Sequence, residues 1–260
     1  MKKTNIIATM GFWLMFCSIV FGIITNGGLS TIINFIHLPS FLVTCGGAFF
    51  AVMATADSLE DYLDGLKSIF VAYQKVEEKT DQISLQIMEL SDIARKEGLL
   101  SLEEKSDEIE NEFLEKGIRL IVDGTDPELI RDILENDLLH KEERDKKRVR
   151  FWQDMGSYGP AWGMLGTLLG LVNMLRAMGS DMAALGAGMS LALITTLYGS
   201  ILANWVCIPT ARKLEKSSAE ETLVMEIAIE GVLSIQAGEN SRIIKEKIKS
   251  IIKMEEDETT

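Results

Sequence analysis

The longest apolar stretches of this 260-residue chain contain no Asp, Glu, Lys or Arg in their interiors. They cover residues 6–24, roughly 39–56, 155–175 and a core within 182–211. A transmembrane helix needs about 20 mostly apolar residues, so each stretch is long enough to cross a bilayer. Ion relays inside membranes usually depend on an ionisable side chain. If ions cross the membrane along this chain, another chain therefore has to supply the carboxylate.

Cysteine and histidine are scarce, and their positions exclude several kinds of site. Cys17, Cys45 and Cys207 fall inside the predicted spans without paired spacing, so neither a disulfide framework nor a zinc site is indicated. His37 and His140 are predicted to lie on opposite sides of the membrane. The sequence also lacks a Walker loop, an HExxH motif and a GxSxG motif. We therefore expect no enzyme, no metal and no cofactor.

Basic residues beside the spans predict the orientation, because Lys and Arg stay preferentially in the cytoplasm. Lys2 and Lys3, residues 146–150 and residues 212–216 all fall on one side of a four-span arrangement, and Asp181 falls in an outer turn. We predict an all-α, multi-pass protein of the cytoplasmic (inner) membrane with both termini in the cytoplasm. Its parts are spans 1 and 2 (1–56), a helical cytoplasmic domain (57–154), spans 3 and 4 (155–211), and C-terminal cytoplasmic helices with an acidic tail (212–260).

The acidity of the chain belongs to one region. Residues 57–154 hold 27 acidic and 15 basic residues, a net charge of −12 out of −13 for the whole chain. Such a surface repels nucleic acid and anionic lipid, so its partner would be a protein with exposed basic groups. The alternative is a solvated surface that only keeps the region soluble.

Apolar periodicity in the cytoplasmic region predicts amphipathic helices. The repeating positions are Ile83, Ile87, Leu90 and Ala94, followed by Leu114, Ile118 and Ile121. Asp126 and Pro127 predict a helix start that leads into the third span. Residues 215–237 are predicted to form a helix that neighbouring helices largely cover and that ends at Gly238. Residues 241–253 are predicted to form an amphipathic helix that docks on the domain or on the membrane.

Glycines recur near helical spacing in the third and fourth spans and give each span a narrow face. Small faces let transmembrane helices approach closely, and hydroxyls beside them bond across helices or line a wet path. Thr167, Thr195 and Thr196 are therefore candidates for an ion path. The alternatives are helix packing for the glycines and bonding to carbonyls of their own helices for the threonines.

Pro160 and Pro209 fall toward the predicted cytoplasmic ends of spans that run in opposite directions. We therefore expect the two prolines to lie at similar depth. A proline inside a helix removes a backbone hydrogen bond and permits a kink. Two kinks at one level would form a hinge, whereas an isolated kink is usually passive.

Four runs of residues resemble the MotA family of flagellar stator proteins. They are residues 159–167 (GPAWGMLGT), residues 195–199 (TTLYG) followed by Pro209, residues 94–103 (ARKEGLLSLE) and residues 229–236 (IEGVLSIQ). The likeness covers nearly the whole chain in order. The glycine-rich third span alone is also similar to ExbB and TolQ proteins.

The resemblance implies a function and its partners. Several copies, taken to be five, would surround two copies of MotB, whose single span brings the aspartate that carries the ion. Arg95 and Glu103 would contact the rotor protein FliG, and Pro160 and Pro209 would couple ion passage to movement. On one helix Arg95 and Glu103 would lie within about 80° of each other, unless Gly98 interrupts that helix. Without the resemblance, both would be ordinary surface charges.

Two other functions remain as alternatives to a stator. An ExbB- or TolQ-like protein would use the ion gradient to drive an envelope partner, but those relatives have three spans. A passive membrane scaffold would only anchor the acidic domain, and it would need no hydroxyl-lined spans. The coupling ion stays open between H⁺ and Na⁺, and the three threonines resemble those of sodium-driven members of the family.

Overall fold

The computed structural model describes residues 6–73, 79–178 and 182–258, and these ranges form helices without a strand. Contacts divide the chain into two compact units. The first unit comprises Met1–Lys75 and Lys146–Glu215, and the second comprises Val76–Asp145 and Lys216–Thr260. The domain borders predicted from the sequence lie at the expected boundaries of the membrane, and they remain a prediction. Lys2, Lys3 and Asp181, which entered the predicted topology, lie outside the described residues.

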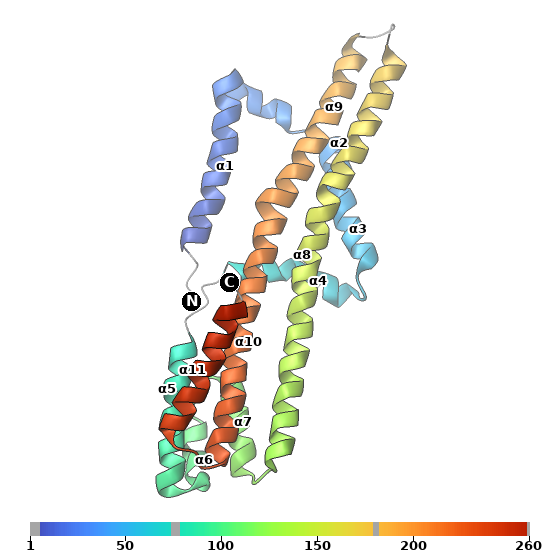
Figure 1. The fold of residues 1–260 in the computed structure, drawn as a ribbon. Coiled ribbons are helices and arrows are strands. Elements are labelled where there is room, and N and C mark those ends of the chain that lie inside the picture. The colour runs from blue at the N-terminus through green and yellow to red at the C-terminus, as the bar shows by residue number, and fades with distance from the viewer. Residues whose placement is uncertain (1–5, 74–78, 179–181, 259–260) are drawn as a thin grey trace. The chain divides into compact units, whose positions relative to one another are not determined.

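The first unit contains the apolar helices (Figure 1). Its first half consists of α1 (Ile6–Gly27), η1 (Leu29–Phe35), α2 (Leu38–Phe41), the π-helical η2 (Leu42–Gly46), α3 (Gly47–Thr55) and α4 (Leu59–Ala72). Its second half consists of the C-terminal part of α8 (Pro127–Ala177), α9 (Met182–Ile201), the π-helical η4 (Leu202–Cys207) and the start of α10 (Ile208–Gln236). The all-α fold is confirmed.

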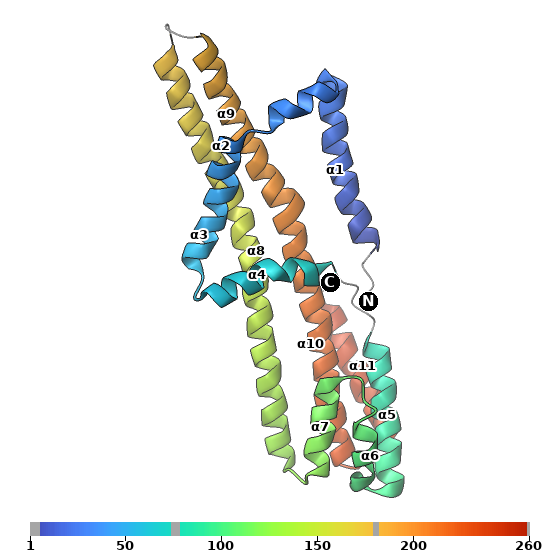
Figure 2. The ribbon, with the colours of Figure 1, turned by 180° about the vertical axis from the view of Figure 1, so that it is seen from behind.

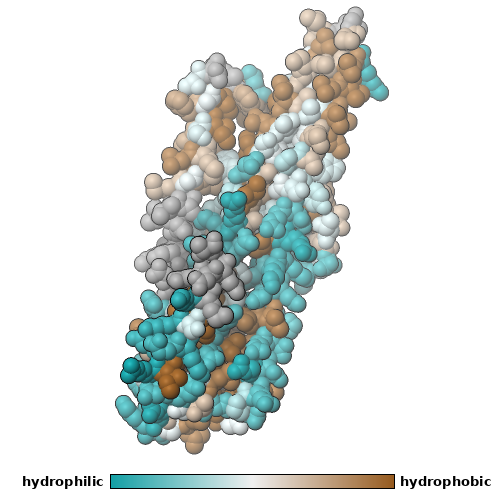
Figure 3. Space-filling model, in the orientation of Figure 1, coloured by the Kyte–Doolittle hydropathy of each residue, from teal (hydrophilic) through white to brown (hydrophobic). Residues whose placement is uncertain are grey.

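Two helical stretches among the described residues are long and apolar enough to cross a membrane, namely Ile32–Thr55 and Met182–Gln236. Met10–Thr25 is a shorter apolar helix. The third predicted span, in α8, is not among them, because its glycines, Trp162 and Asn173 lower the mean hydropathy of this stretch. The count of four spans therefore stays a prediction. The surface over the C-terminal part of α8 and over α9 is nevertheless largely apolar (Figure 3).

Helix α4 runs across α8 and is fixed to it by three kinds of contact (Figure 2). Gly65 allows the ring of Phe151 to approach so closely that a Cβ at this position would lie 2.5 Å from it. The indole N–H of Trp152 donates to the buried Ser68 hydroxyl at 2.9 Å. Arg148 makes two hydrogen bonds with the Asp64 carboxylate, at 2.7 and 2.9 Å. These contacts therefore hold α4 against the turns of α8 that lead into its apolar run.

The second unit is a helical domain around an aliphatic core. It consists of α5 (Lys79–Glu97), η3 (Leu99–Ser101), α6 (Leu102–Ser106), α7 (Glu112–Val122), the start of α8, most of α10 and α11 (Ser241–Glu258). The predicted core positions are all buried, which confirms the periodicity: Ile83, Ile87, Leu90, Ala94, Leu114, Ile118 and Ile121.

Two predicted helix boundaries of this unit are confirmed. Asp126 caps α8, because its Oδ1 accepts from the backbone N–H of Glu128 at 3.0 Å while Pro127 begins the helix. At the end of α10, Gly238 adopts φ +68°, and its N–H bonds to the Ile235 carbonyl at 3.0 Å. Helix α8 then continues without interruption from Pro127 to Ala177.

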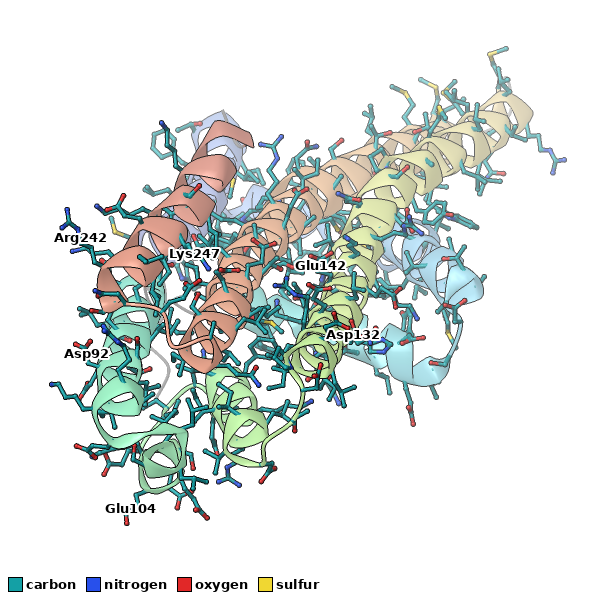
Figure 4. The ribbon with its side chains drawn as sticks, turned by 60° about the horizontal axis from the view of Figure 1, so that its bottom comes forward. Asp92, Glu104, Asp132, Glu142, Arg242 and Lys247 are labelled. Atoms are coloured by element: carbon teal, nitrogen blue, oxygen red, sulfur yellow. The ribbon has the colours of Figure 1, made fainter. Side chains whose placement is uncertain are left out.

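Helix α11 docks on the domain through part of its predicted apolar face. Ile244 and Ile248 are buried in the core, whereas Ile243 is 52% exposed. Lys247 faces α10 (Figure 4), where its ammonium group lies 2.8 Å from the carboxylates of both Glu230 and Glu239. The hydrogen bond from Lys247 is the main reason that the pKa of Glu239 is lowered. Apolar burial and one ion-pair network therefore hold α11 in place.

Candidate functional site

Helices α8 and α9 run side by side in opposite directions (Figure 1), and glycines set the distance between them. A Cβ on Gly163 would lie 2.9 Å from the carbonyl oxygen of Thr195, and one on Gly199 would lie 2.5 Å from that of Gly159. Real Cβ atoms essentially never show contacts under 3.0 Å. Close packing between two helices of the same chain therefore accounts for these glycines.

Two of the three predicted threonine hydroxyls meet at the edge of this helix pair. Thr167 Oγ1 of α8 lies 2.6 Å from Thr196 Oγ1 of α9. Both hydroxyls also lie within hydrogen-bond distance of the Ala192 carbonyl, at 3.1 and 3.2 Å. Each hydroxyl has one proton and two lone pairs, so each oxygen keeps at least one lone pair for a further donor or a cation. Thr196 is exposed and Thr167 half-buried, so this hydroxyl pair is accessible.

Thr195 differs from the other two threonines. Its side chain is completely buried, and its hydroxyl donates within α9, to the carbonyl of Leu191 or Ala192 at 2.9 and 3.0 Å. A Cβ on Gly166 would lie 2.5 Å from Thr195 Cγ2, which shows that this side chain fills the contact with α8. The structure therefore brings Thr167 and Thr196 together at a surface and gives Thr195 a packing position.

The expectation that Pro160 and Pro209 lie at similar depth is wrong. Pro160 lies opposite Gly199, since a Cβ on that glycine would be 3.1 Å from Pro160 Cα. Pro209 follows Gly199 by ten residues along the same helical stretch, which corresponds to about 15 Å. The physical reason is that the ends of the apolar runs do not fix the register between the two helices, whereas the glycine contacts do. Pro209 instead lies in the first turn of α10, two residues after the end of the π-helical η4.

Arg95 and Glu103 both lie exposed on the second unit, but they do not share a helix. Arg95 is in the last turn of α5, Gly98 interrupts the chain with φ +90°, and Glu103 is in the first turn of α6. The predicted angle of about 80° therefore does not apply. Glu104, the neighbour of Glu103, projects away from α6 (Figure 4).

Comparisons with known proteins identify the family of this chain. The MotA/TolQ/ExbB proton channel family matches residues 105–227. Motility protein A of Borreliella burgdorferi is 41% identical over 94% of this chain and 90% of that protein, and the uncharacterized protein YtxD of Bacillus subtilis is 38% identical over 95% and 90%. The chain belongs to the MotA family of flagellar stator proteins.

A solved structure extends the comparison to three dimensions. The flagellar MotAB stator complex from Bacillus subtilis contains a chain with a TM-score of 0.81 and 28% sequence identity, and the match covers 94% of both chains. This MotA-family chain is therefore a membrane protein and a stator subunit of the bacterial flagellar motor. The alternatives of an envelope energiser and a passive scaffold are not favoured.

Two residues that position the site had no assigned role in the sequence. Thr44 of η2 is buried and donates to the Thr195 carbonyl at 3.3 Å, which fixes η2 to α9. Tyr198 donates to the Phe35 carbonyl and accepts from the backbone N–H of His37 at 3.1 Å. A hydroxyl in the middle of the second apolar run could have identified Thr44, whereas the contacts of Tyr198 depend on the tertiary fold.

The Asp, Glu, Lys and Arg residues of this MotA-family chain lie outside the interiors of the apolar runs. Lys147 precedes the apolar run of α8, lies 3.5 Å from the carboxylates of both Asp61 and Asp57, and has a raised pKa because of their attraction. Within the described ranges, no group of three or more His, Cys, Asp or Glu residues is arranged to hold a metal ion. The groups that this chain places at the hydroxyl pair are the neutral oxygen atoms of Thr167, Thr196 and the Ala192 carbonyl.

Proposed function

We propose that this stator subunit assembles with a MotB-like single-span protein into a complex that converts an ion gradient into torque. One observation carries the proposal: an accessible pair of hydroxyls, Thr167 and Thr196, lies within two apolar runs, residues 155–175 and 182–211, that contain no Asp, Glu, Lys or Arg. Polar groups inside a membrane are costly and usually functional. The hydroxyl pair is suited to a carboxylate that another chain provides.

In this proposal the partner's carboxylate lies beside the hydroxyl pair. The free lone pairs of Thr167 and Thr196 accept a hydrogen bond from the protonated acid, or they replace water around a sodium ion. Both coupling ions therefore fit the site, and sodium is the favoured ion because the threonines resemble those of sodium-driven members. Thr195 contributes by holding α9 at its distance from α8.

The assembly and its rotor contact belong to the same proposal. The subunit would form a homo-oligomer, a pentamer, around the partner's spans in the inner membrane, with both termini in the cytoplasm. The rotor protein FliG would meet the exposed charges at Arg95 and Glu103. Exposed charges of this kind contribute little to folding, so a role in recognition explains their position better than a role in stability.

Ion flux through the complex with its MotB-like partner tests the function. Thr167→Ala removes one hydroxyl of the pair together with the γ-methyl group, and we expect sodium uptake into proteoliposomes to fall at least several-fold. Thr25→Ala is the matched control, because Thr25 is an exposed threonine of α1 that bonds only to carbonyls of its own helix among the described residues. Flux that is equal in both variants, at every sodium concentration and pH, would remove the hydroxyl pair from the path.

A further inference from the structure

The exposed face of α9 changes character at the hydroxyl pair. Thr196, Ser200 and Asn204 are all exposed and recur at i, i+4 and i+8, so they lie on one face that continues from α9 into η4. Toward the other end of α9, the same face carries Met189, which is 53% exposed, and Leu193, which is 69% exposed. The face is therefore polar on one side of the hydroxyl pair and apolar on the other.

Helix α8 borders the polar part of this face with residues of the same kind. Thr167 contacts Thr196, and Pro160 lies against Gly199, which identifies the flank of α8 that faces this side. Gln153 precedes Pro160 by seven residues, as Pro160 precedes Thr167, so all three share that flank. Ser157 adjoins them, and both Gln153 and Ser157 are exposed.

The polar atoms on this face are poorly satisfied by the chain itself. Asn204 Nδ2 donates to the Ser200 carbonyl at 3.0 Å, which leaves the amide oxygen of Asn204 available. Within the described part of the chain, the hydroxyls of Ser157 and Ser200 have no hydrogen-bond partner. Exposed polar atoms in lipid would cost several kcal/mol. Water on this face would satisfy them.

We propose that Thr196, Ser200 and Asn204, together with Ser157 and Gln153, line a water-filled exit for a monovalent cation that leaves the hydroxyl pair. This inference rests on the proposed function, since the predicted topology places the η4 end of the face toward the cytoplasm. From Thr196 to Asn204 the exit spans about 12 Å along the helix axis. Neutral oxygen atoms hold the hydration shell of a cation without trapping the ion, which favours release.

Water access to the two parts of the face can be measured with cysteines. Ser200→Cys and Leu193→Cys are made in a Cys17→Ser background, because Cys45 and Cys207 are buried. Inverted membrane vesicles that contain the complex with its MotB-like partner are treated with a water-soluble, thiol-reactive cation. Thiols react as thiolates, which form only where water reaches them. We expect the cysteine at position 200 to react at least ten-fold faster than that at position 193, and equal rates would overturn the exit.

A flux measurement separates this inference from the proposed function. Asn204→Leu should reduce ion flux several-fold, and Asn204→Ser should restore part of it. Asn173→Leu is the control, because Asn173 is an exposed asparagine on another flank of α8, about 120° from Thr167. Normal flux in Asn204→Leu beside reduced flux in Thr167→Ala would refute the exit alone. A wild-type complex that conducts no ion would refute the proposed function.

Discussion

Replacing Gly170 by alanine tests whether the contact between α8 and α9 stabilises the first unit. The added Cβ would lie 2.6 Å from the carbonyl oxygen of Gly188 and 2.7 Å from the backbone nitrogen of Ala192. Favourable contacts lie near 3.5–4.0 Å, so the two helices would have to separate by about 1 Å. Because the opposing atoms are backbone, no side-chain rotation can relieve the clash.

The expected cost follows from overpacking of well-packed interiors, which usually amounts to about 1–3 kcal/mol. For a chain of this size, a loss of about 2 kcal/mol lowers the melting temperature by roughly 4–8 °C. Thermal unfolding of the detergent-purified protein, followed by tryptophan fluorescence, measures this change. Trp162 of α8 is a suitable reporter because its ring packs directly against Gly47.

Gly186→Ala is the matched control on α9. Gly186 is exposed, and an added Cβ would meet no atom within 4 Å. Alanine favours helix by up to about 1 kcal/mol over glycine, so this variant should melt at the wild-type temperature or slightly above it. If Gly170→Ala melts together with Gly186→Ala, the two helices do not approach as closely as described, and the argument for the hydroxyl pair loses its basis.

Four further variants test other parts of the molecule. Charge reversal at the rotor contact, as Arg95→Glu or Glu103→Lys, should weaken motility while membrane abundance stays unchanged; a protein that disappears from the membrane would make these residues structural. Pro160→Leu restores a backbone donor and should leave complexes that assemble with the partner but generate little rotation, whereas normal torque would rule out a hinge. Lys247→Met should destabilise the second unit by about 1 kcal/mol in thermal unfolding at neutral pH, and an unchanged melting temperature would contradict the ion-pair network. Because Lys247 lowers the pKa of Glu239, this contribution is complete above the ordinary value of 4.5 and is lost as the pH falls through the lowered pKa, so the variant and the wild type should converge in acid.

The helices and the core of the second unit could be predicted because local patterns determine them. Apolar residues at helical spacing identified Ile87 and Ile118 as core positions, and Asp126 with Pro127 marked the start of α8. These signals lie within one turn of the residues that they describe. The exposure of Ile243 was not predicted, because it depends on how α11 rotates against the core.

The candidate site was predicted only in part, since its geometry depends on the register between helices. The sequence identified the three threonines but could not distinguish the buried Thr195 from the accessible Thr167 and Thr196. It placed Pro160 and Pro209 at one level, because no local signal shows that Pro160 lies opposite Gly199. The absence of a carboxylate from the apolar runs was the stronger indication of function, because it follows from composition and does not depend on the register between the helices.

Rotation of single motors tests the central claim most directly. Cells that lack their own stators receive this chain together with its MotB-like partner, and the speed of tethered cells is recorded while the sodium gradient and the proton gradient are stepped separately. We predict that rotation is restored and that its speed follows one of the two gradients, with sodium favoured. A complex that assembles and conducts ions but never turns the rotor would contradict the stator function and favour an energiser of another envelope partner.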